Sequence, residues 1–285
     1  MTLITTLTRR PPLPWTRLSA FTPATSNKLV FRAPFGTSRK MSNSNFTAKP
    51  FRLTLIQLGG LGGDKSANLA HAREMVMKAA EPVDGKKSDL VVLPECFNSP
   101  YGVQHFPKYA ETIGYESGKP YDAATNGSES IKALSAMAKE AKVWLLGGSI
   151  PERDGSDGKL YNTSTVYNSS GDLIAFHRKV HLFDIDIPGG ITFKESETLS
   201  GGSKLTTFET DFGKIGLGIC YDIRFPEMAM IAARQGCVVM IYPGAFNLTT
   251  GPLHWELLQR GRAIDNQMYV SMCSPARDMT AGYHA

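Results

Sequence analysis

Residues 214–235 read KIGLGICYDIRFPEMAMIAARQ. The apolar run at the start predicts a short strand over 214–220 that ends on Cys220. Pro226 begins a segment predicted to be a helix over 226–235, because proline is favoured in the first turn of a helix. A side chain at a strand–turn–helix junction is exposed, and the next backbone N–H points toward the same place. The stretch therefore predicts an α/β fold with Cys220 as a candidate nucleophile, although most free cysteines are inert core residues.

Further strands are predicted on both sides of this stretch. Residues 90–93 (LVVL) form a continuous apolar run, as expected for a strand buried on both faces. The remaining predicted strands cover 53–58, 143–150, 238–242 and 268–274, with a hairpin over 161–168 and 172–177 around Ser170 and Gly171.

Helical spacing of apolar residues predicts helices between these strands, over 64–81, 128–142 and 252–267. In the last helix the inward-facing side is expected to carry Leu257, Leu258, Gly261 and Ile264. Strands that alternate with helices, with one hairpin inserted, indicate a single α/β domain with mixed sheets over residues 51–285. No apolar run reaches the roughly 20 residues that a membrane helix needs, so no membrane partner is expected.

The positive charge of the chain is concentrated in its first 52 residues. That segment has nine Lys and Arg and no acid, and the first acid of the chain is Asp64. The rest of the chain has 22 bases against 26 acids, so the net charge of +5 does not describe the domain. Nucleic-acid binding needs a basic face on the folded part, and no nucleic-acid partner is therefore expected.

Residues 1–50 form a basic extension rich in Arg, Ser, Thr and Pro. This composition is typical of a mitochondrial transit peptide. Translation from Met41 is an alternative interpretation, and an extension without a role is a third. A cytoplasmic location, a mitochondrial one, or both are expected.

Besides Cys220 the chain has three cysteines, Cys96, Cys237 and Cys273, and none lies at a CxxC spacing. A zinc site or a thioredoxin-like motif is therefore not expected. All three lie in or beside apolar strands, where core packing is the default interpretation. Reduced thiols in an intracellular compartment are the simplest explanation of this pattern.

Two side chains outside the quoted stretch are candidates for chemistry. Glu95 follows the apolar strand of residues 90–93, and the carboxyl ends of strands face the usual ligand crevice of α/β folds. Lys179, in FHRKVHLFD, is able to stabilise an oxyanion or to transfer a proton. The alternatives are a surface acid at a strand end and a solvated basic segment, in which His177 and His181 are structural.

Four further charged residues have structural interpretations as well. Glu195, in TFKESETL, lies in a loop where acids are usually solvated, and catalytic support is the minority interpretation. Asp222, Arg224 and Glu227 follow Cys220 closely, and acids that flank an Arg more often form a structural ion-pair network than a substrate site.

Taken in order, LVVLPE, HRKVHLFD and GLGICYDIRFPE resemble the three signatures of the nitrilase superfamily. The similarity extends from about residue 52 to the last residue. It includes LPECFNSPYG, DIDIPGGITFKES, YPGAFNLTTGPLHW and RGRAIDNQMYV, which resemble the ω-amidase branch more than the nitrilases proper or the carbamoyl-amide hydrolases.

The resemblance implies a four-layer α-β-β-α sandwich that forms homodimers through its helices. It also implies a catalytic triad of Glu95, Lys179 and Cys220 with Glu195 as a supporting carboxylate, and no metal or organic cofactor. The reaction implied is amide hydrolysis through a thioester on Cys220, with the backbone N–H of Tyr221 helping to stabilise the oxyanion.

The branch resemblance suggests a small dicarboxylate monoamide as substrate, such as α-ketoglutaramate or succinamate. Tyr101 and Thr250 lie in segments expected to contact its far carboxylate. Two alternatives keep the triad and change the substrate, to deaminated glutathione or to a carbamoyl amide. A third, of another class, is a non-catalytic interaction protein, because family members continue for roughly 50 further residues and the domain is expected to be truncated at its C-terminus.

Overall fold

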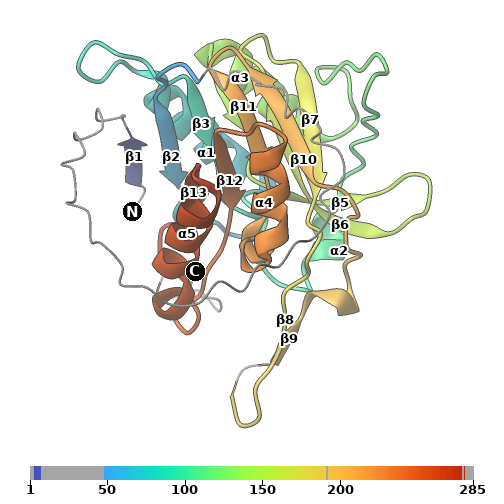
Figure 1. Cartoon of the computed structure of the whole chain (residues 1–285). Helices are drawn as coiled ribbons and strands as arrows, with labels where there is room; N and C mark the ends of the chain where they lie inside the picture. The colour runs from blue at the N-terminus through green and yellow to red at the C-terminus, as the bar shows by residue number, and fades with distance from the viewer. Residues whose placement is uncertain (1–2, 8–47, 191, 278, 280–285) are drawn as a thin grey trace, which may run out of the picture.

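A computed structural model describes residues 3–7, 48–190, 192–277 and 279, and for residues 3–7 it describes the backbone. The described chain forms two large sheets, a small two-stranded sheet and helices on the outer faces of the large sheets (Figure 1). No helix of the described part is long and apolar enough to span a membrane.

The first sheet has seven strands, with β2, β3 and β4 running parallel to one another at its centre. Antiparallel strands flank this parallel core, and β7 pairs with β6. Its strands are β1 (Leu3–Leu7), β2 (Leu53–Gln57), β3 (Leu90–Val92), β4 (Trp144–Leu146), β5 (Ile150–Arg153), β6 (Leu160–Tyr167) and β7 (Leu173–Arg178).

The second sheet has the order β10-β11-β12-β13, with β11, β12 and β13 parallel and β10 antiparallel to β11. Its strands are β10 (Thr206–Thr210), β11 (Gly213–Leu217), β12 (Val239–Pro243) and β13 (Tyr269–Cys273). Between the two sheets in sequence, β8 (Asp184–Asp186) and β9 (Thr192–Lys194) form a hairpin that projects from the body of the molecule (Figure 1).

The helices are α1 (Lys65–Ala80), α2 (Phe106–Tyr109), α3 (Glu129–Ala141), α4 (Pro226–Arg234) and α5 (Gly251–Asn266). Side-chain caps define the starts of two of them. Asp64 accepts a hydrogen bond from the backbone of Ala67, and Ser128 accepts one from Ile131, so each satisfies an N–H that the first turn leaves free. The predicted helices over 64–81 and 128–142 therefore agree with the structure to within a residue at each end.

Alternate residues of the central strands serve different cores, which makes the protein a four-layer sandwich. Val91 of β3 packs toward α1 and α3, whereas Leu90 and Val92 pack against the second sheet. On β12, Ile241 faces the first sheet and Met240 faces the side of α4 and α5. Three apolar layers thus separate four structural layers in the order helix, sheet, sheet, helix, as the resemblance implied.

The strand predicted over 143–150 is interrupted: β4 ends at Leu146, and the chain continues in the same direction as β5, so that both strands pair antiparallel with β6. Gly148 lies in the break with a φ of +61°, and a Cβ on it would lie 2.1 Å from the carbonyl oxygen of Pro94. Only glycine fits this contact, which brings the break against the segment that carries Glu95. The two consecutive glycines, Gly147 and Gly148, are the sequence signal for the break between β4 and β5.

The inner face predicted for the helix over 252–267 is also partly wrong. Leu257 and Ile264 are 67% and 66% exposed, while Leu258 packs against the core beneath α5. The side of α5 that faces the protein instead carries the buried Arg262, which donates to the backbone carbonyls of Ile223 and Arg224. An apolar face of α5 is therefore left open.

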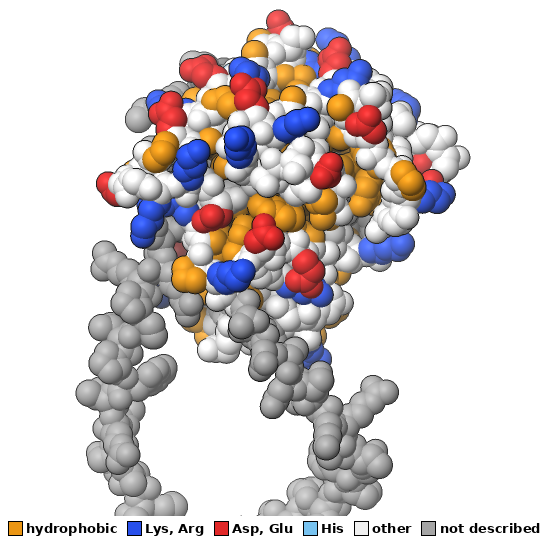
Figure 2. All heavy atoms as spheres, turned by 90° about the horizontal axis from the view of Figure 1, so that it is seen from above, with side chains coloured by type: hydrophobic (Ala, Val, Ile, Leu, Met, Phe, Trp, Pro, Cys, Tyr) orange, Lys and Arg blue, Asp and Glu red, His pale blue; other side chains and the backbone are white. Residues whose placement is uncertain are grey.

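The N-terminal extension is partly included in the described structure. Residues Leu3–Leu7 pair antiparallel with β2, with Leu3 opposite Gln57. Most of the proposed targeting segment, residues 8–47, lies outside the described residues. From above, acidic and basic side chains are intermixed over the domain with apolar side chains between them (Figure 2), so this face has no patch of one sign.

Candidate active site

The candidate site lies where three strand-following turns meet at the carboxyl ends of β3, β11 and β12. The backbone N–H of Glu95, after β3, donates to the carbonyl of Gly244, after β12, at 3.4 Å. The N–H of Gly218, after β11, donates to Ile241 of β12. Carboxyl ends of neighbouring parallel strands are the usual location of an α/β ligand site.

Cys220 lies in a strained turn and not in the strand predicted for it. The strand ends at Leu217, and Cys220 begins a short 3-10 helix, Cys220–Arg224, with a φ of +44°. Non-glycine residues rarely adopt this left-handed conformation, and it costs on the order of 1–3 kcal/mol. Gly244 lies against Cys220, and a Cβ added at Gly244 would be 3.8 Å from the Cys220 sulfur. Cys96, next to Glu95, has the same kind of backbone, with a φ of +50°.

Lys179 joins the two predicted carboxylates. Its Nζ lies 2.9 Å from Oε1 of Glu95, 2.9 Å from Oε2 of Glu195 and 3.0 Å from Oε1 of Glu195. All three side chains are fully buried. Lys179 directly follows β7, so the first sheet supplies it, while the second sheet supplies Cys220.

Glu195 is buried, contrary to the expectation for a loop acid. It begins the 3-10 helix Glu195–Glu197 and accepts from the backbone N–H of Phe183 at 2.8 Å. The hydroxyl of Tyr101 donates to its Oε1 at 2.7 Å. Both oxygens of Glu195 are therefore held by partners from separate segments, which fixes the carboxylate behind Lys179.

Burial and charge together set the protonation of the site. Burial raises the pKa of Glu95, and the ammonium of Lys179 opposes this rise. Burial lowers the pKa of Lys179, but the charges of Glu195 and Glu95 outweigh it and raise that pKa well above its ordinary value. Burial and the charge of Glu95 raise the pKa of the Cys220 thiol well above its ordinary value. At rest the site therefore holds a neutral thiol, a charged ammonium and a carboxylate of raised basicity.

Asp222 connects the segment of Lys179 to the turn of Cys220. Its Oδ1 accepts from the backbone N–H and the ring Nδ1 of His181, at 2.9 and 2.8 Å. Its Oδ2 accepts from the ring Nε2 of His177 and from the backbone N–H of Ile219, at 3.1 and 2.9 Å. His177 and His181, on either side of Lys179, thus have the structural role expected from the sequence. They hydrogen-bond to Asp222 in the turn that carries Cys220.

The ion-pair network predicted among Asp222, Arg224 and Glu227 is wrong. Asp222 bonds to histidines rather than to Arg224, and Glu227 is exposed. The Nε of Arg224 is buried without a hydrogen-bond partner in the described part of the chain. The guanidinium lies 5.3 Å from the ring centre of Tyr221. Arg224 is therefore a cation beside the candidate nucleophile whose hydrogen-bonding capacity is not fully used.

A narrow hollow opens onto Cys220, and its cavity volume is about 10 Å³. It is lined by Tyr101, Phe183, Cys220, Tyr221, Arg224, Ala245, Phe246 and Thr250. The three residues predicted to contact substrate, Tyr101, Tyr221 and Thr250, are thus brought together with the thiol. The space holds about one water molecule, so a substrate enters only when lining side chains move.

Asn162 was missed as a site residue in the sequence. It lies on β6, is 1% exposed, and its Nδ2 donates to Oε1 of Glu95 at 2.8 Å. Its backbone carbonyl accepts from the N–H of Lys179 at 2.8 Å, which extends the β6–β7 pairing by one residue. The hairpin predicted around Ser170 and Gly171 was the one signal that placed the two strands side by side.

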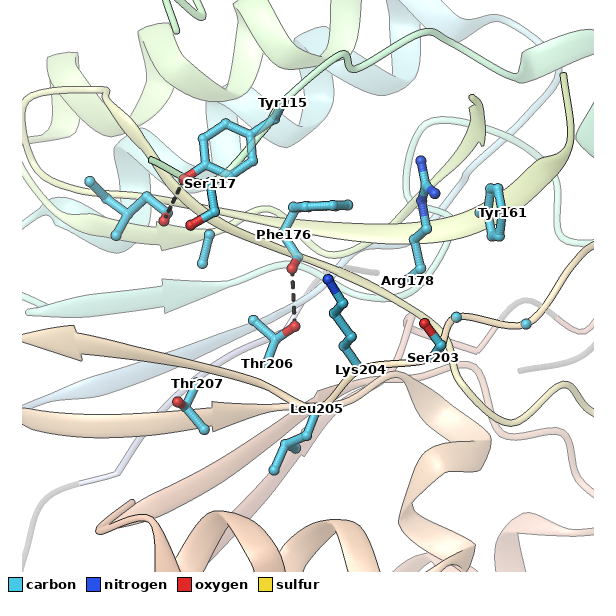
Figure 3. Close-up of a pocket in the computed structure, with 14 residues that line it drawn as sticks. Tyr115, Ser117, Tyr161, Phe176, Arg178, Ser203, Lys204, Leu205, Thr206 and Thr207 are labelled. Carbon is cyan, nitrogen blue, oxygen red and sulfur yellow. Dashed lines mark hydrogen bonds between the residues drawn. The ribbon is translucent and has the colours of Figure 1, made fainter. Parts of the chain in front are cut away.

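A larger hollow of about 500 Å³ lies between β7 and β10, behind the strand that leads to Lys179 (Figure 3). Two cationic side chains line it, Arg178 and Lys204, and Arg178 is already paired with Glu152 and Asp154 at 2.6 Å each. Thr206 donates to the carbonyl of Phe176 across it. None of the candidate site residues lines this hollow, so its size does not make it the active site. In the described chain no three His, Cys, Asp or Glu side chains gather as a metal site.

Two helix-covered sheets with a thiol, an ammonium and two carboxylates gathered at their strand ends define an enzyme of the amide-hydrolysing class. The chain belongs to the carbon–nitrogen hydrolase family, whose model matches residues 52–285.

Known relatives agree with this assignment. A curated hydrolase of Schizosaccharomyces pombe is 59% identical over 237 residues, which cover 83% of this chain and 68% of that protein. The omega-amidase NIT3 of Saccharomyces cerevisiae is 52% identical over 245 residues, covering 86% of this chain and 80% of that protein. The crystal structure of Saccharomyces cerevisiae Nit3, a member of branch 10 of the nitrilase superfamily, superposes with a TM-score of 0.74 at 49% identity, covering 85% of this chain and 82% of that chain.

Proposed function

We propose that the protein hydrolyses the terminal amide of a small dicarboxylic acid monoamide, of the succinamate or α-ketoglutaramate type, to the dicarboxylate and ammonia. The observation that carries the proposal is the buried ammonium of Lys179, which bridges Glu95 and Glu195 next to Cys220. Similarity to the omega-amidase NIT3 supports the substrate class.

In this mechanism Glu95 takes the proton of Cys220 as the sulfur attacks the amide carbon. The ammonium of Lys179 and the backbone N–H of Tyr221 stabilise the oxyanion. Glu95 returns the proton to the departing nitrogen, so that ammonia leaves and a thioester remains. Glu95 then removes a proton from water, the resulting hydroxide attacks the thioester, and the thiol is regenerated.

Arg224 is the better partner for the far carboxylate of the substrate than the two hydroxyls expected from the sequence. The hydroxyl proton of Tyr101 is donated to Glu195, and that of Thr250 to Oδ1 of Asn247. Arg224 lines the same hollow and has an unsatisfied buried Nε. A guanidinium matches a carboxylate in charge and in geometry.

The test is ammonia release from succinamate by the purified chain, measured beside Cys220→Ala. We expect release that depends on Cys220. A folded chain that releases no ammonia from succinamate, but does so from deaminated glutathione or a carbamoyl amide, would replace the substrate and retain the triad. A folded chain with all four cysteines equally slow toward a thiol reagent would instead support the non-catalytic interpretation.

We further propose that the protein forms a homodimer through α4 and α5. Their outer surfaces expose Met230 and Ile231 on α4 and Leu253, Leu257 and Ile264 on α5. An exposed apolar surface of this kind marks a protein–protein interface. The two helices are neighbours in the outer layer of the second sheet, so one partner covers both (Figure 1).

Targeting to mitochondria remains our proposal for the basic N-terminal extension. Its lack of acids is the supporting observation. Fusion of residues 1–50 to a fluorescent protein is expected to direct it to mitochondria, beside a fusion that begins at Met41 as the control. Diffuse cytoplasmic fluorescence from both fusions would remove the proposal.

A further inference from the structure

The two oxygens of the Glu95 carboxylate are in different environments. Oε1 accepts from Nζ of Lys179 at 2.9 Å and from Nδ2 of Asn162 at 2.8 Å. Oε2 is buried and accepts no hydrogen bond from a nitrogen or oxygen donor in the described part of the chain, while the Cys220 thiol lies close enough to interact with the carboxylate. A carboxylate oxygen that already accepts two charge-assisted bonds is a weaker base than one that accepts none.

We propose that Asn162 is a positioning residue for the general base: by donating to Oε1 of Glu95, it leaves Oε2 as the oxygen that takes and returns the reacting proton. The inference rests on the proposed function, because it assigns a proton-transfer role to Glu95. It adds a residue that neither sequence patterns nor the triad includes.

The orientation of the Asn162 amide follows from chemistry. A carboxylate has no hydrogen to donate, so the NH2 group of the amide, and not its carbonyl, faces Glu95. Asn162 is held in place by its position in β6, where it lies opposite Lys179 in the extended β6–β7 pairing. Side chains directly opposite each other in an antiparallel pair lie on the same face of the sheet. Asn162 and Lys179 therefore reach the same oxygen of Glu95 from neighbouring strands.

Without the second donor, the carboxylate is free to rotate and to exchange its oxygens, because Lys179 alone fixes one contact. The ionised form also loses a hydrogen bond that stabilises it. Both effects act on proton transfer and leave substrate contacts unchanged. A residue with a merely structural role would change stability without changing the pH dependence of the reaction.

The test compares Asn162→Leu, which keeps the approximate volume and removes the donor, with the wild type. We expect kcat for succinamate to fall roughly 10–100-fold while KM stays within about twofold. The acid limb of the kcat/KM profile is expected to move up by about one pH unit, because loss of a bond to the charged form raises the pKa of Glu95. An unchanged acid limb would overturn the proposal.

Asn98→Leu is the matched control. Asn98 is also a buried asparagine whose Nδ2 donates to a glutamate, Oε1 of Glu111 at 3.2 Å, and that glutamate anchors the start of α3. We expect it to lower stability without moving the acid limb. If Asn98→Leu moves the limb as far as Asn162→Leu does, the effect is a general one of buried asparagines and the assignment to Asn162 is wrong.

Asn162→Asp keeps the shape of the side chain if the leucine variant fails to fold. A protonated Asp donates to Glu95, whereas an ionised one repels it, so activity is expected to fall as the pH rises, the opposite slope to the wild type. The rate of Cys220 alkylation against pH gives a readout without an amide substrate, and it should shift in the same direction as the turnover profile. If Cys220 of the wild type is alkylated with an acid limb in the pH profile but succinamate is not hydrolysed, the substrate proposal alone is refuted. If the acid limb does not move in either Asn162 variant, the role of Asn162 alone is refuted.

Discussion

At the scale of single residues, the site combines groups whose charges depend on one another. Lys179 is fully buried and is stabilised by two carboxylates, so it remains charged where an isolated buried lysine would lose its proton. The neutral Cys220 thiol beside it is compatible with a mechanism in which Glu95 removes the proton only as the sulfur attacks. The raised pKa of Glu95 makes it a stronger base for that step.

The pH dependence of the reaction should report Glu95. Since burial raises the pKa of Glu95 above its ordinary value, the base is ionised above that raised pKa and protonated below it. We therefore expect kcat/KM to fall as the pH decreases through a value above the ordinary range for a glutamate. A rate profile for succinamate between about pH 4 and pH 8 measures this limb. A limb at or below the ordinary glutamate pKa would contradict the assignment.

Arg224→Gln tests carboxylate recognition. Loss of a charge-assisted bond is expected to lower kcat/KM for succinamate roughly 10–100-fold, mainly through KM, with little effect on a neutral amide of similar size. Arg224→Lys should lose less, because it keeps the charge but not the two-pronged geometry. Arg234→Gln, an exposed arginine of α4, is the control and should leave both substrates unaffected. Equal losses on charged and neutral amides would show that Arg224 acts structurally.

At the scale of elements, turns rather than helices hold the site. The segments that follow the strand ends supply the backbone of Glu95, Lys179 and Cys220, and each residue lies within three residues of the end of its strand. Asp222 then connects two of these turns through four hydrogen bonds. Asp222 therefore helps to set the distance between the Lys179 ammonium and the Cys220 thiol, although its four hydrogen bonds go to neither group.

Asp222→Asn is expected to weaken both fold and catalysis. Hydrogen bonds from His177 and His181 lower the pKa of Asp222 despite its burial, so its ionised form stabilises the fold above its ordinary pKa, and this contribution is lost only as the pH falls through the lowered value. Removing the charge at neutral pH should cost about 3–5 kcal/mol in the free energy of unfolding. Urea unfolding at pH 7 measures it.

Glu227→Gln, an exposed position three residues after the 3-10 helix Cys220–Arg224, is the control for that experiment. We expect its free energy of unfolding to match the wild type within about 0.5 kcal/mol. An Asp222→Asn variant that is as stable as this control would show that the four hydrogen bonds contribute little.

At the scale of the whole molecule, the two sheets pack face to face, and each contributes part of the site. Lys179 and Asn162 belong to the first sheet and Cys220 to the second, so activity requires the apolar layer between the sheets to be intact. The helix α5 approaches the site with its N-cap residue, Thr250, which lines the hollow. The outer face of α4 and α5 is left for the proposed partner subunit.

Leu257→Glu together with Ile264→Glu is expected to yield a monomer, because two charges would be buried in the proposed interface. Sedimentation velocity on the wild type and the double variant measures this. Val83→Glu introduces a charge at another exposed apolar position, 54% exposed, and should leave the dimer intact. A wild type that sediments as a monomer at micromolar concentration would contradict the dimer.

The sequence by itself predicted the main strands and helices, but not α2, β8, β9 or β10, and it indicated three separate chemical groups. Apolar runs and helical spacing are local properties, and they predicted α1, α3 and α4 closely. The ordered motifs around Glu95, Lys179 and Cys220 were sufficient to indicate a carbon–nitrogen hydrolase, as the family match shows. Periodicity failed on α5 because it does not say whether an apolar face meets its own core or an open surface.

Only the tertiary structure decided which side chains surround these groups. The β6–β7 register shifts between Val166 and Tyr167, and this irregularity, which no local pattern predicts, places Asn162 rather than Tyr161 opposite Lys179. Arg224 and Asp222 are two residues apart, yet one faces the hollow and the other the histidines. Contacts between residues distant in sequence arise from how two sheets pack, and that packing minimises the free energy of the whole chain rather than of any segment.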